Sequence, residues 1–261
     1  MIVYKYLPAY DYVFDSVLEK SRIRFTQPNL FNDPFESLPS FAEEKNQKIE
    51  FAKNDFRARF NSEITADSLK RILHHYYEEL ANMPATLGKT IVSLCLTQRR
   101  NNGLMWSHYA DSHKGLAIGF DSDCSFFKPG NGKAKQGLKK ITYSEKRESV
   151  FTRIPIEDGE NELEKYFFTK SNDWVYEEEF RICAFTEFAN KPIEKDRDGF
   201  EMYLYNFPPE CVKEVILGFR MSKENQEKVA KIVANKFPKA ELLQAVLNDS
   251  NFDLDIVPYS S

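Results

Sequence analysis

The sequence Thr90-Ile-Val-Ser-Leu-Cys-Leu-Thr97 lies at the centre of the pattern that decides the fold. Its run of apolar and β-branched residues is typical of a buried β-strand. The segment 101–111 that follows it predicts a short helix, and Leu-Ala-Ile-Gly-Phe at 116–120 predicts another strand. Working outward, we expect further strands at 2–7, 23–26, 141–143, 180–185, 212–217, 242–246 and 252–257.

Helical patterns separate these strands at irregular intervals. The clearest runs through 69–80, where apolar residues recur on one face and Thr65 or Asp67 is positioned to cap the helix. Strands spaced so irregularly do not suit a doubly wound parallel sheet, so we predict an α+β fold with a mixed, largely antiparallel, split β-sheet core and flanking helices. We expect a single domain over 1–261 with a helical insertion at 42–82. Other expected elements are helices at 11–21, 43–59, 160–170 and 222–237, an ordered loop at 27–36, and a mobile hairpin at 128–140.

Composition excludes several classes of protein. The chain has 36 basic and 40 acidic residues and a net charge of -4, which provides no global attraction to nucleic acid or to an anionic membrane. No apolar run approaches the roughly 20 residues of a membrane span, so we expect no membrane association and a cytoplasmic location. The widely spaced cysteines are expected to be reduced thiols, mostly in the core: Cys95, Cys124, Cys183 and Cys211.

Four segments carry more polar chemistry than a core requires. In the loop 32–36, Pro34 and Phe35 hold Asn32, Asp33 and Glu36 in fixed positions, either for a ligand or as a structural turn. In the segment 101–111, Trp106, His108 and Tyr109 lie within one helical turn. They could stack on a planar ring such as nicotinamide or adenine, or they could pack in the core.

The third segment precedes the strand at 180–185. If it is extended, Glu177, Glu179 and Arg181 share one face, and the two carboxylates raise each other's pKa unless a cation is near. The alternative is a solvated strand end with a weak ion pair. The fourth segment is the pair of N-terminal strands, where Lys5, or Arg24 beside Thr26, could bind a phosphate or carboxamide or could be ordinary edge-strand charges.

These motifs, in this order, resemble a widespread bacterial domain family of unknown function. The resemblance covers nearly the whole chain. It rests on Arg-Phe-Thr at 24–26, Asn-Asp-Pro-Phe-Glu at 32–36, Trp-Ser-His-Tyr-Ala-Asp at 106–111, Gly-Leu-Ala-Ile-Gly-Phe at 115–120, Trp-Val-Tyr-Glu-Glu-Glu-Phe-Arg at 174–181 and Val-Ile-Leu-Gly at 215–218.

More remotely, the chain resembles the ADP-ribosyltransferase superfamily, whose small split sheet cleaves NAD at its nicotinamide bond. That resemblance implies Glu179 as the catalytic carboxylate and Glu177 as the upstream member of a Glu-x-Glu pair. The strand at 2–7 has no His or Arg, and no Ser-Thr-Ser triplet occurs. Two positions therefore stay open: Lys5 or Arg24 for the basic residue, and Thr26 or Tyr109 for the hydroxyl.

The leading hypothesis is an NAD-dependent ADP-ribosyltransferase-like enzyme, as in a bacterial toxin or a phage-defence effector. NAD would be its nucleotide substrate, a protein or nucleic acid its acceptor, and an antitoxin or regulatory protein its partner. One alternative is a nuclease that binds Mg²⁺ through Asp33, Glu36, Glu177 and Glu179. However, His108 has no second His at metal-binding spacing, and we assign no metal site. The other alternative is a non-catalytic sensor whose partner surface is the segment 42–82.

Overall fold

The computed structural model describes all of the chain except residues 41–48, 51–52, 55–56, 60–62, 131–135, 148–164 and 261. The described residues form two compact units. The first comprises Met1–Thr26, Ile91–Ile141 and Asp173–Ser261, and the second comprises Gln27–Thr90 and Thr142–Asn172. Each unit is built from stretches of chain that are distant in sequence. The expectation of one domain with an insertion at 42–82 stays a prediction.

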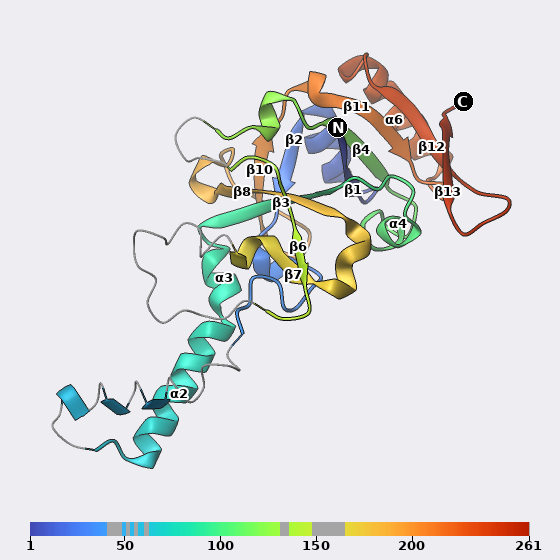
Figure 1. Cartoon of the computed structure of the whole chain (residues 1–261). Helices are drawn as coiled ribbons and strands as arrows, with labels where there is room; N and C mark the ends of the chain where they lie inside the picture. The colour runs from blue at the N-terminus through green and yellow to red at the C-terminus, as the bar shows by residue number, and fades with distance from the viewer. Residues whose placement is uncertain are drawn as a thin grey trace. The chain divides into compact units, whose positions relative to one another are not determined.

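The first unit is organised by an eight-stranded sheet in the order β13-β12-β11-β4-β1-β3-β8-β5 (Figure 1). Its neighbouring strands are antiparallel except for β11 and β12, so the predicted α+β class with a mixed, largely antiparallel sheet is confirmed. The strands are β1 (Ile2–Leu7), β3 (Ile91–Thr97), β4 (Leu116–Asp121), β5 (Lys139–Lys140), β8 (Glu179–Phe185), β11 (Val212–Leu217), β12 (Glu241–Leu247) and β13 (Leu254–Pro258).

The pairing of this sheet is weakest at its middle. β1 pairs with β3 through a single described position, Tyr4 with Thr97, whereas β1 runs in continuous register with β4 and β3 with β8. Next to that one pair, the Lys5 ammonium donates a hydrogen bond to the Cys95 carbonyl oxygen, 3.1 Å away. A side-chain hydrogen bond thus adds to the single described backbone pair between β1 and β3.

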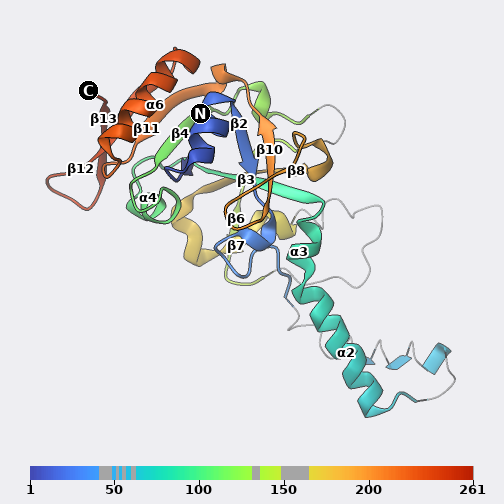
Figure 2. The ribbon, with the colours of Figure 1, turned by 180° about the vertical axis from the view of Figure 1, so that it is seen from behind.

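Shorter elements cover this sheet. A three-stranded sheet joins β2 (Arg22–Phe25), β10 (Glu201–Asn206) and β9 (Glu194–Lys195). The expected helix at 11–21 is the π-helix η1 (Val13–Glu19), and the expected helix at 222–237 is α6 (Lys223–Lys236) with Ser222 as its N-cap. Figures 1 and 2 show α6 beside β11 and β12 from opposite sides. The remaining elements are α4 (Gly103–Tyr109) and the 3-10 turns η3 (Ser125–Phe127), η4 (Asn172–Glu177), η5 (Thr186–Phe188) and η6 (Pro209–Cys211).

Alternating side chains divide the core into two apolar clusters. On β1, Val3 and Leu7 join a large cluster that includes residues of η1 and α6. Tyr4 and Tyr6 join a smaller cluster with Trp106 of α4. Because successive strand residues point to opposite faces, α4 packs on one face of the sheet while η1 and α6 pack on the other.

The second unit contains η2 (Pro28–Leu30), α2 (Ala66–Ala81), α3 (Met83–Leu87) and the parallel pair β6 (Thr142–Ser144) with β7 (Thr169–Ser171). Thr65 caps α2 as expected, because its hydroxyl accepts the amide of Ser68 at 3.2 Å. The expected helix at 43–59 is described only at 49–50, 53–54 and 57–59, and all of these residues are helical. The start of the expected helix at 160–170 and the middle of the hairpin at 128–140 lie outside the described residues, and 165–168 are helical. The end predicted as helix at 169–170 is strand β7 instead, because it pairs with β6.

The prediction of four reduced cysteines is wrong for two of them. Cys124 and Cys211 form a disulfide, while Cys95 and Cys183 are free thiols. The two bonded residues are 87 positions apart, and folding brings their Cα atoms to 5.6 Å. No short Cys motif announces a pair of this kind in the sequence. Within the described residues, no helix is both long and apolar enough to cross a membrane.

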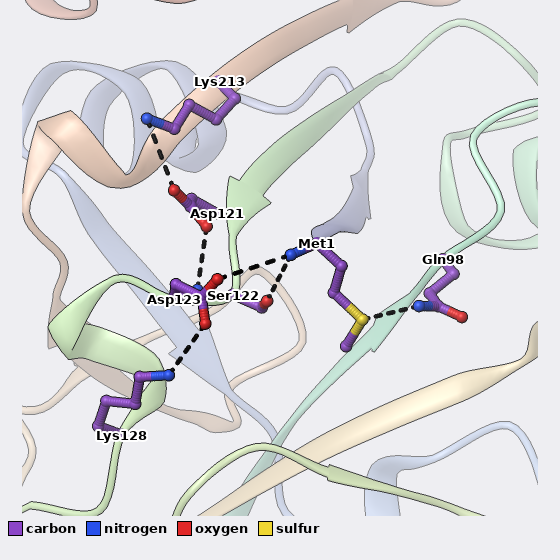
Figure 3. Close-up of polar contacts among 7 residues, drawn as sticks. All are labelled: Met1, Gln98, Asp121, Ser122, Asp123, Lys128 and Lys213. Atoms are coloured by element: carbon purple, nitrogen blue, oxygen red, sulfur yellow. Dashed lines mark hydrogen bonds and ion pairs between the residues drawn. The ribbon is translucent and has the colours of Figure 1, made fainter.

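Charged side chains surround the start of β1 (Figure 3). The Met1 amino group donates to the Ser122 hydroxyl at 3.1 Å, and Asp123 lies 3.2 Å from Lys128. The backbone amide of Asp123 and the ammonium of Lys213 help to lower the pKa of Asp121 below its usual value. These surface contacts connect the ends of β1, β4 and β11, and they contain none of the predicted site residues.

Candidate functional site

The predicted acidic segment changes conformation in the middle of its three glutamates. Glu177 ends η4, Glu179 begins β8, and Glu178 between them has a positive φ of 44°. The prediction that Glu177, Glu179 and Arg181 share one strand face is therefore wrong for Glu177, because it precedes the strand. A non-glycine residue in the left-handed region carries backbone strain that the surrounding structure must maintain.

Glu177 is held on both its side chain and its backbone. The residue is 3% exposed, and its carboxylate accepts a hydrogen bond from the Tyr109 hydroxyl at 2.6 Å. Its carbonyl oxygen accepts a hydrogen bond from the hydroxyl of Thr97, the residue of β3 that pairs with Glu179. The end of η4 is thereby fixed against α4 and β3.

Glu179 and Arg181 form a buried ion pair on one face of β8. Glu179 is 2% exposed and Arg181 is fully buried. Both Nε and Nη2 of the guanidinium reach Oε1 of Glu179, at 2.8 and 2.7 Å. Removing two charges from water is costly, and only close pairing of this kind offsets the loss of hydration. The cation that the sequence analysis proposed for this carboxylate is Arg181.

Lys5 adds a second cation to this part of the sheet. Burial lowers the pKa of its ammonium, while electrostatic interaction with Cys95, Glu179 and Glu177 opposes that shift. The first unit therefore brings together Lys5, Tyr109, Glu177, Glu179 and Arg181. We call these five residues the carboxylate centre.

The helix α4 is placed next to this centre by its N-cap. The Asn102 side chain accepts the backbone amides of Leu104 and Met105 and donates to the Tyr176 carbonyl oxygen at 3.2 Å. One amide group thus caps α4 and ties it to η4. Asn102 and Thr97 were not predicted as site residues, although an Asn directly before a helical segment is a recognisable N-cap signal.

Trp106 is part of the core. Its ring is fully buried, its indole nitrogen donates to the Arg100 carbonyl oxygen at 3.0 Å, and it packs edge-on against Tyr6 at 5.0 Å between ring centroids. Of the two readings proposed for this ring, these contacts match core packing. Trp106 anchors α4 and is not positioned to stack on a ligand.

Other aromatic rings near the carboxylate centre remain accessible. His108 is exposed, and its ring lies 6.2 Å from that of Tyr109 and 6.5 Å from that of Tyr176. Trp174 lies 6.1 Å from Tyr176. The row Trp174, Tyr176, His108 and Tyr109 offers partly exposed π-faces beside Glu177, as a planar ligand requires.

Arg24 and Thr26 have separate partners in the first unit. The Arg24 guanidinium pairs with Asp196 at 2.8 Å and lines a cavity of about 570 Å³ that Tyr10 and Arg197 also line. Thr26 exchanges two backbone hydrogen bonds with Ser93. The proposed arrangement of Arg24 and Thr26 as one ligand-binding face is therefore replaced by an ion pair and a backbone bridge.

Asn32, Asp33 and Glu36 belong to the second unit. Asn32 is exposed, whereas Asp33 and Glu36 are buried. Oδ1 of Asp33 accepts the amide of Phe35 at 2.8 Å, and its carbonyl oxygen accepts the amide of Glu36 at 3.1 Å. These contacts match the structural turn that the sequence analysis gave as one reading. In the described part of the chain, no group of three or more His, Cys, Asp or Glu residues is arranged to hold a metal ion.

Comparison with known proteins gives one match. Residues 105–182 match the family described as "Protein of unknown function (DUF2971)", which confirms the expected resemblance to a domain family of unknown function. The matched segment contains four members of the carboxylate centre, all except Lys5. No curated protein and no solved structure matches the chain.

Proposed function

We propose that the protein is an NAD-dependent ADP-ribosyltransferase-like enzyme whose reaction takes place at the carboxylate centre. One observation carries the proposal: two buried carboxylates flank a strained residue at the start of β8, and each has its own partner. Strained backbone and clustered buried charges are typical of functional sites. Partly exposed aromatic rings beside the carboxylates supply a surface for a base.

The chemistry would divide between the two glutamates. The bond between ribose C1′ and the nicotinamide nitrogen breaks, nicotinamide leaves with the bonding electrons, and C1′ gains oxocarbenium character. A fixed carboxylate stabilises that positive charge, which is the role we assign to Glu179. The acceptor then bonds to C1′ and releases a proton, which Glu177 takes up while Tyr109 orients its carboxylate.

The aromatic row would position the nicotinamide. Tyr109 and Tyr176 present partly exposed rings beside Glu177, and His108 lies between them. A base stacked on these rings places its glycosidic bond near the carboxylates. In this proposal Trp106 contributes by holding α4 in place. The acceptor would be a protein or a nucleic acid, as in a toxin or a phage-defence effector.

The test is the release of nicotinamide from NAD by the purified full chain, in the presence of protein and nucleic-acid acceptors. We expect Glu179→Gln to reduce release about 100-fold or more, as loss of transition-state charge stabilisation does elsewhere. The matched control is Glu214→Gln, which alters another buried carboxylate of the same sheet that accepts from Tyr4 and Arg100. Its activity should equal that of the unchanged protein.

Circular dichroism and urea unfolding of both variants establish that they are folded. Absence of nicotinamide release by the folded, unchanged protein with every acceptor would refute the proposal. Equal loss of activity in the Glu179 and Glu214 variants would also refute it, because the effect would then be one of stability.

A further inference from the structure

The second unit contains a polar cavity of its own. The cavity has a volume of about 340 Å³ and is lined by residues of the loop at 33–38, by the end of β6 and the residues after it, and by β7 with the residues before it. All of these belong to the second unit. Its volume lies at the lower end of the roughly 300–1,000 Å³ that is usual for small-molecule sites.

The charged side chains in the described lining of this cavity are mainly cationic. Among these described residues, two acids, Asp33 and Glu145, face four bases. Asp33 already uses one carboxylate oxygen to accept the Phe35 amide. The described part of the wall therefore carries more positive than negative side chains, within a chain whose net charge is -4. A local excess of this sign attracts anions. The four bases are Lys146, Arg147, Lys165 and Lys170.

Ser37 provides the strongest sign of a missing ligand. The residue is 3% exposed and lines the cavity, yet its Oγ has no hydrogen-bond partner among the described residues. Its φ of 55° shows that the loop holds it in the left-handed region. A buried hydroxyl without a partner loses its hydrogen bond to water and gains none in return, which is unfavourable. A ligand oxygen that accepts from this hydroxyl would remove that cost.

The apolar part of the wall suits a ligand larger than a simple ion. The Arg147 guanidinium lies over the Phe35 ring, 5.2 Å from its centroid, and Phe35 is 56% exposed. Ser144 and Ser171 pair across β6 and β7 at the same cavity, where the Ser144 hydroxyl donates to the Lys146 carbonyl oxygen at 2.7 Å. Cations and hydroxyls together provide the donors that phosphate oxygens accept.

We propose that this cavity binds a small phosphate-bearing molecule, with its phosphate oxygens on Ser37 and the lysines and its remainder against Phe35. The site is independent of the NAD cleavage proposed for the first unit. Its test requires no catalysis, so failure of either proposal leaves the other standing.

The experiment is calorimetric titration of the full chain with inorganic pyrophosphate at low ionic strength. We expect saturable binding that Lys170→Met weakens about tenfold, as loss of one charge-assisted contact would. Ser37→Ala should weaken it several-fold. The matched control is Lys70→Met, which removes an exposed lysine of α2 that does not line the cavity, and its affinity should be unchanged.

Two further ligands sharpen the result. Adenosine diphosphate should bind more tightly than pyrophosphate if Phe35 contacts the rest of the ligand, and Phe35→Ala should remove that difference. Sulfate at the same concentration should bind more weakly. No saturable heat with pyrophosphate, equal binding of sulfate, or equal weakening by the Lys70 and Lys170 variants would overturn the proposal. Circular dichroism of each variant confirms that it is folded.

Discussion

Two buried acidic sites on the main sheet, the one around Glu214 and the carboxylate centre, contain the same residue types but differ in their surroundings. Glu214 accepts from the Tyr4 hydroxyl at 3.1 Å and from Arg100 at 3.1 and 3.2 Å. At the carboxylate centre, Tyr109 donates to Glu177, while Arg181 pairs with Glu179. Tyrosine, glutamate and arginine are therefore close together in both regions.

The two sites differ in what surrounds them. Glu214 lies inside β11, paired with strands on both sides, and its partner Arg100 has a side chain that is 44% exposed. The carboxylate centre has two acids, a strained residue between them and a fully buried arginine. Buried acid–arginine pairing alone therefore does not mark a functional site. Backbone strain and a second buried carboxylate distinguish the centre from Glu214, whose strand partner Glu241 is exposed.

The largest expected difference between the two sites concerns their arginines. Arg181→Met leaves the Glu179 charge buried without its cation and should lower the free energy of unfolding by about 3–5 kcal/mol. Arg100→Met removes a partly exposed guanidinium and leaves Tyr4 on Glu214, so about 1 kcal/mol or less is expected. Urea unfolding of both variants measures the two losses. Equal losses would show that the two sites are energetically alike.

The next effect concerns alkaline pH. Burial, together with the charge of Glu214, raises the pKa of Tyr4 to about 12. The unfolded chain, with a tyrosine pKa of about 10, loses this proton first. The stabilisation that this raised pKa provides is therefore complete below pH 10. It is lost as the pH rises toward 12, which lowers the free energy of unfolding by about 2–3 kcal/mol. Unfolding free energies between pH 9 and 12 should fall less steeply for Tyr4→Phe. An unchanged slope would contradict this assignment.

The smallest effect tests the strain at the carboxylate centre. Glu178→Gly relieves the positive φ and should raise the free energy of unfolding by about 0.5–1 kcal/mol, after the entropy cost of glycine. The variant also loses the exposed contact with Arg99, which contributes little. The control Glu178→Gln loses that contact but keeps the strain, so its stability should hardly change. Destabilisation by glycine would mean that the conformation of Glu178 carries no strain.

Much of the secondary structure could be predicted because its signals are local. Apolar and β-branched runs predicted β1, β3, β4, β8 and β11 within a residue or two. Thr65 caps α2 as expected, and Ser222 at the start of the expected helix at 222–237 caps α6. The strand β10 (Glu201–Asn206) was missed, although its run of aromatic and apolar residues favours a strand. Its main partner, β2, lies far away in the sequence.

The site was less predictable because burial and pairing depend on distant residues. Trp106 and Tyr109 lie in one predicted helix, and composition did not show that the first would be core and the second a hydrogen-bond donor to Glu177. The sequence indicated that Arg24 could bind a ligand, whereas in the fold it pairs with Asp196, which lies far away in the chain. Glu178 carries no sequence signal for its positive φ.

The sequence alone determined the class of the fold, the position of most strands and the residues that bear acid, base and aromatic chemistry, since these follow from local periodicity and side-chain type. Tertiary structure decided which of those residues meet, which are buried, where the backbone is strained and which cysteines are joined. The physical reason is that burial, charge pairing and strain depend on contacts between segments far apart in the chain, which a local pattern does not contain.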